Sequence, residues 1–392
     1  MKNKSRSIIT VLLFSAISIV FFAAASKAST GEFDDACFFM KSKWENERLS
    51  ALQTFMELDD ERAVPFILKG IGDPVAEVRK RAAQALIKLG HINDRMSVPA
   101  LLSQIEQDPD PKALAELIYA LGTFSDSENT AMSFKSDFKN YKREHKCQVI
   151  DALTPLISKH RLAYTRFFEI VSAAAIAPDD ELLRLHAVIN MGEFGDPEYV
   201  LKPLLGTLTD KNDEVRAVTC RYLGEIKHFS ALNPLILRGL KDVSPDVRRA
   251  AVIAVRNYKH PDTFSFFQKV LADDIDGEVR GEAALSFIDL KDRRAVRPLK
   301  NLGVVDAANV VRLNSAYALT TFGNYDAEGV LVWFLWEQNL AAYRRRAISG
   351  LANIRSRSVI DHLQRALSDW DDVVRDTAFY ALRNKWGFHI TQ

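Results

Sequence analysis

The chain has 392 residues, of which 47% are hydrophobic and 26% are charged, and its formal net charge is +1. Glycine and proline are scarce and no long polar segment occurs, which excludes a long disordered tail. A charge so close to zero also disfavours general nucleic-acid binding, because neutralising a phosphate backbone requires a strongly cationic surface.

The N-terminal segment 1–28 has the pattern of a secretory signal peptide. Three basic residues precede an apolar run at 8–25, and the small residues Ser26 and Ala28 follow at the positions that a signal peptidase reads. We therefore predict cleavage after Ala28 and an exported protein, periplasmic or secreted, with a short N-terminal segment at 29–43. Cleavage would remove four of 52 basic residues and no acid, leaving 48 against 51 acidic ones, a net charge of −3. The alternative is an uncleaved N-terminal membrane anchor, since the run is close to the length that spans a bilayer.

The three cysteines do not have the pattern of a disulfide framework. Cys37, Cys147 and Cys220 are odd in number and widely separated, even though an export route would be oxidising. Cys220 stands at a small apolar position of a predicted helix, which favours a buried free thiol.

A column of basic residues recurs along the chain from residue 48 onward. Successive members are evenly spaced from Arg184 to Arg344. The interval is one residue shorter at both ends of the column, and it is longer before Leu114 and after Lys146, which match the pattern less well. The full column is Arg48, Arg79, Leu114, Lys146, Arg184, Arg216, Arg248, Arg280, Arg312, Arg344 and Arg375. These eleven positions predict eleven repeated units.

The residues around this column predict a helical hairpin in each unit. An apolar residue precedes the column position, a small one follows three residues later and a large apolar one seven residues later, which places all of them on one helical face. A second apolar segment, often with an early proline, lies between successive column helices, as at 199–208 and 231–240. One hairpin cannot bury its apolar face but stacked hairpins can, so a fixed period of this length indicates an α-solenoid. We predict an all-α fold, a superhelical stack of about eleven hairpins over 44–392.

An aspartate stands six residues before most column positions, in the turn that opens the helix, where a carboxylate can cap free N–H groups. The order of a proline-containing helix, an aspartate turn and a helix with Val-Arg, small and large apolar positions resembles the HEAT repeat. The short repeats of bacterial HEAT-like proteins and phycobilin lyase subunits are the most similar. Segments 73–90 and 242–258 match best, and the resemblance covers nearly all of 44–386.

The resemblance implies a ladder of hydrogen bonds that links neighbouring repeats through these aspartates and arginines. It carries over to Asp73 and Arg79, Asp210 and Arg216, Asp242 and Arg248, Asp274 and Arg280, Asp306 and Arg312, and Asp369 and Arg375. The pattern fails at Arg184, six residues after Pro178, and at Arg344, six residues after Gln338. We expect those two junctions to be weaker or differently paired.

Two segments depart from the regular pattern. The irregular repeats at 125–180 include 127–146, which predicts a longer charged helix whose residues Phe134, Phe138 and Tyr141 form one aromatic face. That face either packs on the core, which we favour, or belongs to a protruding recognition element. The apolar segment 329–340, which contains two tryptophans, is interpreted as an inter-repeat core helix rather than an exposed patch.

The search for catalytic chemistry is negative. The chain has no glycine-rich phosphate loop after a strand, no nucleophile elbow and no zinc-protease motif. It also lacks the His-Glu dipeptides that HEAT-like di-iron hydroxylases carry. His145 and Cys147 are two residues apart, a poor geometry for ligation on a helix. We predict no enzyme activity, no metal and no cofactor.

The second helix of each hairpin lines the inside of the curve in HEAT arrays, so its outward columns are candidates for recognition. In the C-terminal half these columns are rich in Arg, Tyr and Asn, which interfaces favour, although a solvated face would be polar too. The candidate binding residues are Arg249, Asn314, Tyr317, Arg345, Arg346 and Tyr380. The predicted function is an exported, non-catalytic scaffold that binds a protein or peptide along its concave face, with no nucleic-acid partner and no membrane contact beyond an uncleaved anchor. The alternative is a lyase-like or enzyme-accessory HEAT protein that holds a small ligand or chromophore.

Overall fold

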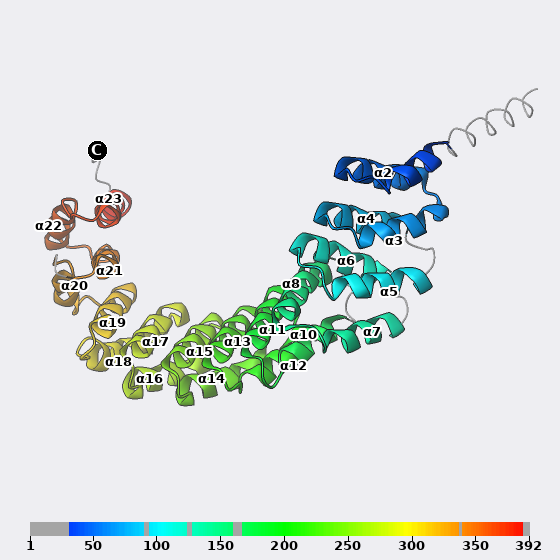
Figure 1. The fold of residues 1–392 in the computed structure, drawn as a ribbon. Coiled ribbons are helices and arrows are strands. Elements are labelled where there is room, and N and C mark those ends of the chain that lie inside the picture. Colours follow the sequence, from blue (N-terminus) through cyan, green and yellow to red (C-terminus); the bar gives the residue numbers. More distant parts are fainter. Residues whose placement is uncertain (1–30, 90–93, 124–127, 160–166, 337–338, 387–392) are drawn as a thin grey trace, which may run out of the picture. The chain divides into compact units, whose positions relative to one another are not determined.

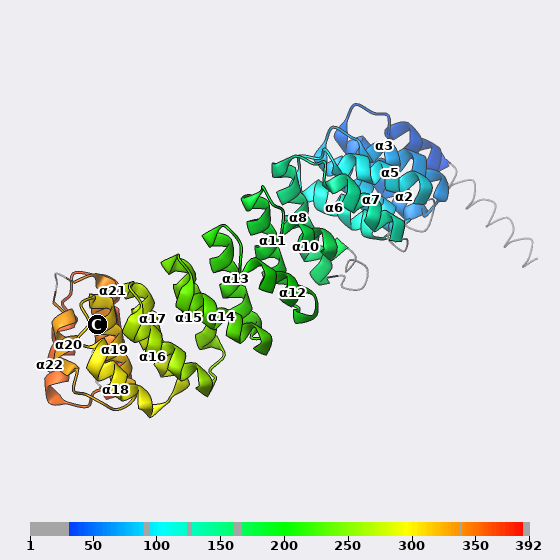
Figure 2. The same ribbon diagram turned by 90° about the horizontal axis from the view of Figure 1, so that it is seen from below.

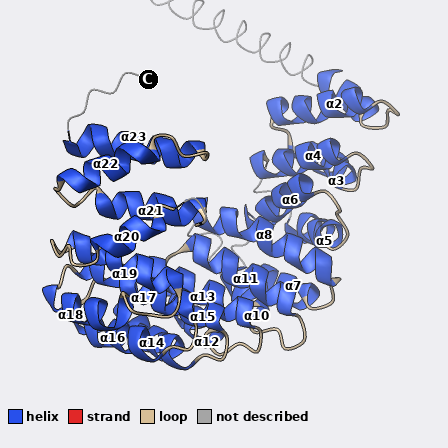
Figure 3. Ribbon diagram, turned by 90° about the vertical axis from the view of Figure 1, so that its left-hand side faces the viewer, coloured by secondary structure: helices blue, strands red, loops and turns tan. Residues whose placement is uncertain are grey.

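A computed structural model describes residues 31–89, 94–123, 128–159, 167–336 and 339–386. Within these ranges the regular structure is helical and no strand occurs (Figure 3). No helix in them is both long and apolar enough to cross a membrane. The predicted signal peptide at 1–28 lies outside the described residues.

The chain divides into two compact units, with the division between Asn190 and Met191. Unit 1 opens with a helix at 31–39. Its further helices are α2 (Glu45–Leu58), α3 (Val64–Ile71), α4 (Ala76–Lys88), α5 (Asp94–Ile105), α6 (Pro111–Thr123), α7 (Glu128–Phe138), α8 (Arg143–Lys159) and α10 (Phe168–Ala174), with a 3-10 turn at Glu61–Ala63. Helix α11 (Glu181–Phe194) runs through the division.

Unit 2 continues the alternation of helices. It contains α12 (Pro197–Thr207), α13 (Asp213–Ile226), α14 (Leu232–Lys241), α15 (Pro245–Asn257), α16 (Phe264–Asp273), α17 (Gly277–Leu290), α18 (Val296–Pro298) with the π-helical η6 (Leu299–Gly303), α19 (Asn309–Thr321), α20 (Glu328–Phe334), α21 (Ala341–Leu351), α22 (Arg357–Ala366) and α23 (Asp372–Trp386). Short 3-10 turns precede α14, α16 and α18 at Phe229–Ala231, Pro261–Thr263 and Arg293–Ala295.

Each hairpin pairs a first helix with a second helix that carries the column residue. In unit 2 the first helices form one layer and the second helices another (Figure 1), and successive hairpins lie side by side (Figure 2). The second helices pack on one another along the unit. Among the described residues the column falls on α2, α4, α6, α8, α11, α13, α15, α17, α19, α21 and α23. The predicted all-α solenoid is therefore confirmed.

The core follows the predicted columns. The small residues three positions after the column, such as Ala251 and Ala283, are fully buried, and so are the large ones seven positions after it, such as Phe55 and Leu223. Burying this face on both neighbours is what a single hairpin cannot do, so the helical period of the apolar residues determines the stack. The three cysteines are free thiols, and Cys220 is buried, as the sequence predicted for that residue. Burial raises the pKa of Cys220 to about 12.

Two predictions about helices need correction. Segment 127–146 is not one long helix, because α7 ends at Phe138 and α8 begins at Arg143. Its three aromatic side chains are nevertheless buried, and the Phe134 ring meets Phe167 edge-on at 5.5 Å between centroids. The face packs on the core, and the protruding element is not supported.

Segment 329–340 was expected to be a core helix, but α20 covers only its first part. Leu331 and Phe334 are buried, whereas Trp333 and Trp336 are exposed by 42% and 58%. The helix is too short to bury all of its apolar residues, so the prediction is correct for one side of the helix and wrong for the two tryptophans.

Gly224 should be essential to the contact between α13 and α15. A methyl group added there would lie 2.6 Å from the Ala254 Cα atom, in the backbone of the neighbouring helix. We predict that Gly224→Ala lowers the free energy of unfolding by about 1–3 kcal/mol, because the helices must separate. Gly206 on α12 has open space around it, so Gly206→Ala should instead stabilise the fold by up to about 1 kcal/mol. Urea denaturation of both variants tests this, and equal effects would contradict the close contact.

Candidate functional site

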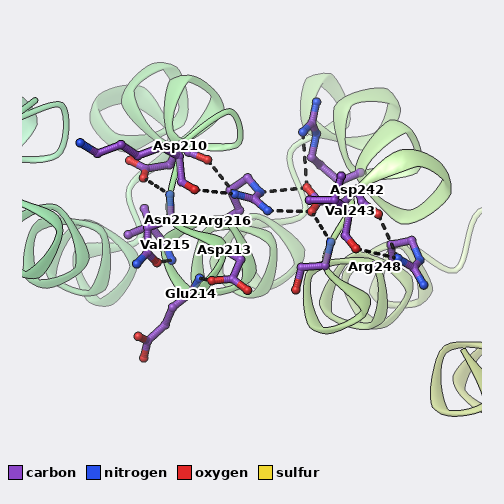
Figure 4. A network of polar contacts seen from close by, with 12 residues as sticks. Asp210, Asn212, Asp213, Glu214, Val215, Arg216, Asp242, Val243 and Arg248 are labelled. Atoms are coloured by element: carbon purple, nitrogen blue, oxygen red, sulfur yellow. Dashed lines mark hydrogen bonds and ion pairs between the residues drawn. The ribbon is translucent and has the colours of Figure 1, made fainter.

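The column arginines form a ladder between neighbouring repeats. The Arg216 Nε and Nη2 atoms donate to the Asp242 carboxylate of the next repeat, over 2.9 and 2.8 Å, and Nη1 donates to the main-chain carbonyl of Asp210 at 2.8 Å (Figure 4). The same two-pronged bond to a carboxylate joins Arg48 to Asp73, Arg79 to Asp108, Arg248 to Asp274, Arg280 to Asp306, and Arg344 to Asp369. We call each such bond a rung.

Each rung aspartate also orders its own turn. The Asp242 carboxylate accepts the N–H of Ser244 at 3.0 Å, which fixes the entry into α15. Burial on its own raises the pKa of Asp242, but hydrogen bonds from Arg216 and from the Ser244 N–H outweigh it and hold the pKa below its ordinary value. The aspartate is therefore a buried anion that ties the turn of one repeat to the guanidinium of the previous one.

The ladder differs from the expected one in its partners. An arginine and the aspartate six residues before it meet only through the main-chain carbonyl, because the carboxylate belongs to the preceding repeat's arginine. The junction at Arg344 is consequently not weakened: its side chain is fully buried, bonds Asp369 and lies 4.8 Å from the Trp370 ring centroid. Arg184 likewise donates to the Ala177 carbonyl at 2.9 Å, since a main-chain carbonyl is present whatever residue supplies it.

The interruption falls instead on Arg312. The residue at the place of its rung aspartate is Gln338, which lies outside the described residues. The Arg312 guanidinium donates to the Asn309 side chain and lies 5.7 Å from the Trp333 ring centroid. An exposed tryptophan thus accompanies the arginine whose counterpart is not an aspartate.

The predicted binding residues lie on the second helices of unit 2, but two of them have structural contacts. Asn314 is buried, donates to the Gly281 carbonyl on α17 at 3.0 Å and accepts from Arg346 on α21 at 2.7 Å. Because Gly281 has no side chain, α17 and α19 approach closely enough to bury Asn314 between them. Asn314 and Arg346 are therefore removed from the candidate set.

The other four predicted residues keep an accessible surface. Arg249 and Arg345 are exposed, Tyr317 is half-buried and Tyr380 is 55% exposed. The only contact of Arg249 with a carboxylate in the described chain is a 3.7 Å pair with the more exposed Asp246. These four residues remain a hypothesis for recognition, and we call them the second-helix set.

A second candidate surface was missed at the sequence level. Five consecutive hairpins of unit 2 each place a large apolar side chain in the turn between their two helices, and each is at least two-thirds exposed. These residues, which we call the turn-edge row, are Val243, Ile275, Val305, Leu340 and Trp370. Three of them directly follow a rung aspartate, as Val243 follows Asp242 in Figure 4. That position was the available signal, since in unit 1 it holds Pro74 and Pro109.

A pocket of about 490 Å³ adjoins the C-terminal end of this row. Val332, Leu335 and Ala366 give it apolar walls, and Trp336, His362 and Arg365 line it too. Across the described ranges, no group of three His, Cys, Asp or Glu side chains is arranged to hold a metal ion. The arrangement suits the binding of an apolar side chain rather than metal chemistry.

Comparison with known proteins places the fold. Residues 40–122, 233–320 and 304–383 match the family described as HEAT repeats, which together is more than half of the chain. No curated protein matches. Among solved structures, Kap121p is similar over 91% of this chain and 46% of its own, with 13% identity and a TM-score of 0.60.

Two complexes of the same karyopherin are similar to the chain as well. Kap121p bound to the extreme C-terminus of the protein phosphatase Cdc14p has 14% identity and a TM-score of 0.61, over 91% of this chain and 46% of the other. Kap121p bound to Nup53p has 13% identity and a TM-score of 0.59, over 90% and 45%. The chain thus spans less than half the length of these structures and shares their fold.

Adjacent arginines allow a controlled test of the ladder. We predict that Arg248→Ala lowers the free energy of unfolding by about 3 kcal/mol, because it leaves the Asp274 carboxylate desolvated and without its cation. Arg249→Ala, one residue away on the exposed face, should change it by less than about 0.5 kcal/mol. Chemical denaturation measures both. Equal stability of the two variants would show that the rung is not structural.

The ladder also predicts acid lability. The pKa values of Asp108, Asp242, Asp306 and Asp369 are lowered from the ordinary 3.8, since hydrogen bonds from the arginine and a turn N–H outweigh burial. A depressed folded-state pKa contributes stability above the unfolded value and loses it as the pH falls through the folded value. The urea midpoint should therefore stay level from about pH 7 to 5 and fall below about pH 4. Asp242→Asn should be less stable at neutral pH and show a shallower fall, and an unchanged profile would exclude Asp242 as a contributor.

Proposed function

The chain belongs to the HEAT-repeat family, and we propose that it is an exported, non-catalytic scaffold that binds a protein partner through its C-terminal unit. The turn-edge row of unit 2 carries this proposal. Large apolar side chains that are two-thirds exposed or more are unfavourable in water, and when they recur along one edge they mark an interaction surface. The adjoining pocket extends this surface with a recess for an apolar side chain.

The rungs explain why such a surface can bind with little loss of entropy. Val243, Ile275 and Trp370 each follow an aspartate whose two carboxylate oxygens are held by an arginine. The backbone at the tip of the turn is therefore ordered before any partner arrives, and side chains that are already placed reduce the ordering cost of binding. Aromatic anchors such as Trp370 and Trp336 are the residue type that most often dominates binding energy.

The nature of the partner is supported by the structural neighbours. Solved structures with this fold include Kap121p with a bound protein segment, the C-terminus of Cdc14p. These structures share the fold of this chain, and its own exposed side chains indicate the binding surface. An apolar row flanked by Arg365 and His362 suits a polypeptide with large apolar side chains and acidic residues. The second-helix set, with Tyr317, Arg345 and Tyr380, is another candidate surface on the same unit.

Export and the lack of catalysis belong to the same proposal. The pattern of segment 1–28 supports export, and the absence of any catalytic motif in the sequence supports a binding role. Comparing the length of the purified native protein with that of the full sequence tests the first point. Retention of segment 1–28 would contradict cleavage after Ala28.

Two triple variants separate the candidate surfaces. The turn-edge variant is Val243→Ser, Ile275→Ser and Leu340→Ser, and the second-helix variant is Tyr317→Ala, Arg345→Ala and Tyr380→Ala. Each should keep the unfolding free energy within about 0.5 kcal/mol per site, because the side chains are at least partly exposed. We expect a partner captured by the wild-type chain to bind the turn-edge variant more weakly by about 2 kcal/mol or more.

Affinity for the captured partner is measured by titration with each purified variant. A loss confined to the second-helix variant would move the site to that face. Full affinity in both folded variants would show that neither of the two substituted surfaces carries the binding energy.

A further inference from the structure

One junction of unit 1 lacks both ends of its rung. The column residue of the third repeat is Leu114, and Asn140 stands at the place of the aspartate that would follow it. Leu114 is buried in the core and presents no donor. In four regular repeats the guanidinium at this position donates to the carbonyls six and five residues before it, as Arg79 does to Asp73 and Pro74. Here the equivalent carbonyls belong to Asp108 and Pro109.

A pocket of about 660 Å³ lies between the two turns that a rung would join at this junction. It is lined by the turn that contains Asp108 and Pro109 and by the turn of the next repeat that contains Asn140 and Tyr141. We call it the rung pocket. A different contact joins the two repeats, because the His145 imidazole hydrogen-bonds to the Ile105 carbonyl. The junction therefore holds without a rung, and the space is left open to solvent.

The rung pocket offers more acceptors than donors. Glu106 and Glu144 line it, and neither forms a salt bridge with any described residue. Asp108 adds a carboxylate, although Arg79 already binds both of its oxygens at 2.6 and 2.7 Å. The one cationic side chain in the lining is the exposed Lys142. A ligand that enters this pocket should carry positive charge and hydrogen-bond donors.

A buried side chain in the lining points to a ligand independently of the charges. Tyr141 is only 5% exposed, and its hydroxyl group has no hydrogen-bond partner among the described residues. Burial raises the pKa of this hydroxyl, so it stays protonated at neutral pH. A buried polar group without a partner is unfavourable, and a donor placed in the pocket would satisfy it.

We propose that the rung pocket binds the guanidinium group of an arginine side chain presented by a protein partner. The partner's arginine would provide the guanidinium group that the chain itself lacks at Leu114. It would donate to the turn carbonyls of Asp108 and Pro109 on one side and to the Asn140 side chain on the other. A planar fork of five donors suits acceptors on two sides, whereas the ammonium of a lysine is a point charge. This site lies in unit 1 and is polar, so it stands independently of the apolar turn-edge row.

The probe is a short peptide, acetyl-Gly-Arg-Gly-amide, titrated calorimetrically into the full chain. Matched peptides replace arginine by lysine or by citrulline, which keeps the shape and removes the charge. We expect the citrulline peptide to bind about tenfold more weakly, the loss expected for a hydrogen bond from a charged group. The lysine peptide should fall between the two. Equal binding of arginine and citrulline, or of arginine and lysine, would overturn the proposal.

Single substitutions locate the site. Glu144→Gln should weaken the arginine peptide about tenfold, whereas Glu45→Gln, an exposed acid on α2, should not change its affinity. Tyr141→Phe should weaken the peptide several-fold without lowering the melting temperature, because it removes a hydroxyl group that has no partner in the free protein. Equal affinities in Glu144→Gln and Glu45→Gln would exclude the rung pocket.

A rebuilt rung gives the opposite test. The double variant Leu114→Arg and Asn140→Asp should fill the pocket with the chain's own guanidinium, raise the melting temperature and abolish peptide binding. If this variant does not fold, Glu144→Gln and Tyr141→Phe decide the question. Free arginine is titrated alongside, and tighter binding of free arginine than of the peptide would overturn the assignment to a protein side chain.

Discussion

The two-pronged bond from an arginine to the aspartate of the next repeat is the constraint on which the rest of the structure depends. Its net contribution to stability is small compared with its parts, since removing two charges from water offsets most of their attraction. The bond matters because it fixes the register between neighbouring repeats. A solenoid repeat contacts only its neighbours, so each junction must set its own register. In Arg216 and its equivalents, one planar group binds a carboxylate on the next repeat and a carbonyl on its own, which fixes both turns at once.

The candidate binding features lie at repeats that depart from the regular pattern of rungs and turns. At Leu114 the rung is missing at both ends, and a polar pocket lies between the two turns. At Arg312 the counterpart residue is a glutamine, and the guanidinium lies beside the exposed Trp333 instead. In the regular repeats of unit 2 the rung is intact, and what varies is the residue after the aspartate. A repeat can therefore gain a binding feature in two ways. It can lose a rung, or it can expose a large apolar side chain in its turn.

The fold could be predicted because the apolar residues that form its core recur at a fixed period in the sequence. The positions three and seven residues after the column are buried, and their spacing places them on one face of a helix. Any stacked hairpin must bury such a face. The rung partners could not be predicted, because in a strict repeat the aspartate that precedes one arginine also follows the previous arginine at a constant interval. The spacing alone cannot tell these two partners apart. The burial of Asn314 was hidden for another reason: it depends on Gly281, on a different helix. The break after Phe138 has neither glycine nor proline to signal it.

The turn-edge row shows why apolar residues in a repeat are easily assigned to the wrong environment. Val243, Ile275 and Trp370 are the residue types that periodic sequences place in the core, yet each follows an aspartate whose carboxylate points into the ladder. Holding that carboxylate inward leaves the next side chain at the tip of the turn, facing solvent. In unit 1 the same position carries Pro74 and Pro109, which stiffen the turn and add little apolar surface. The two units therefore share an architecture and differ in surface chemistry, with the turn-edge row in unit 2 and the rung pocket in unit 1.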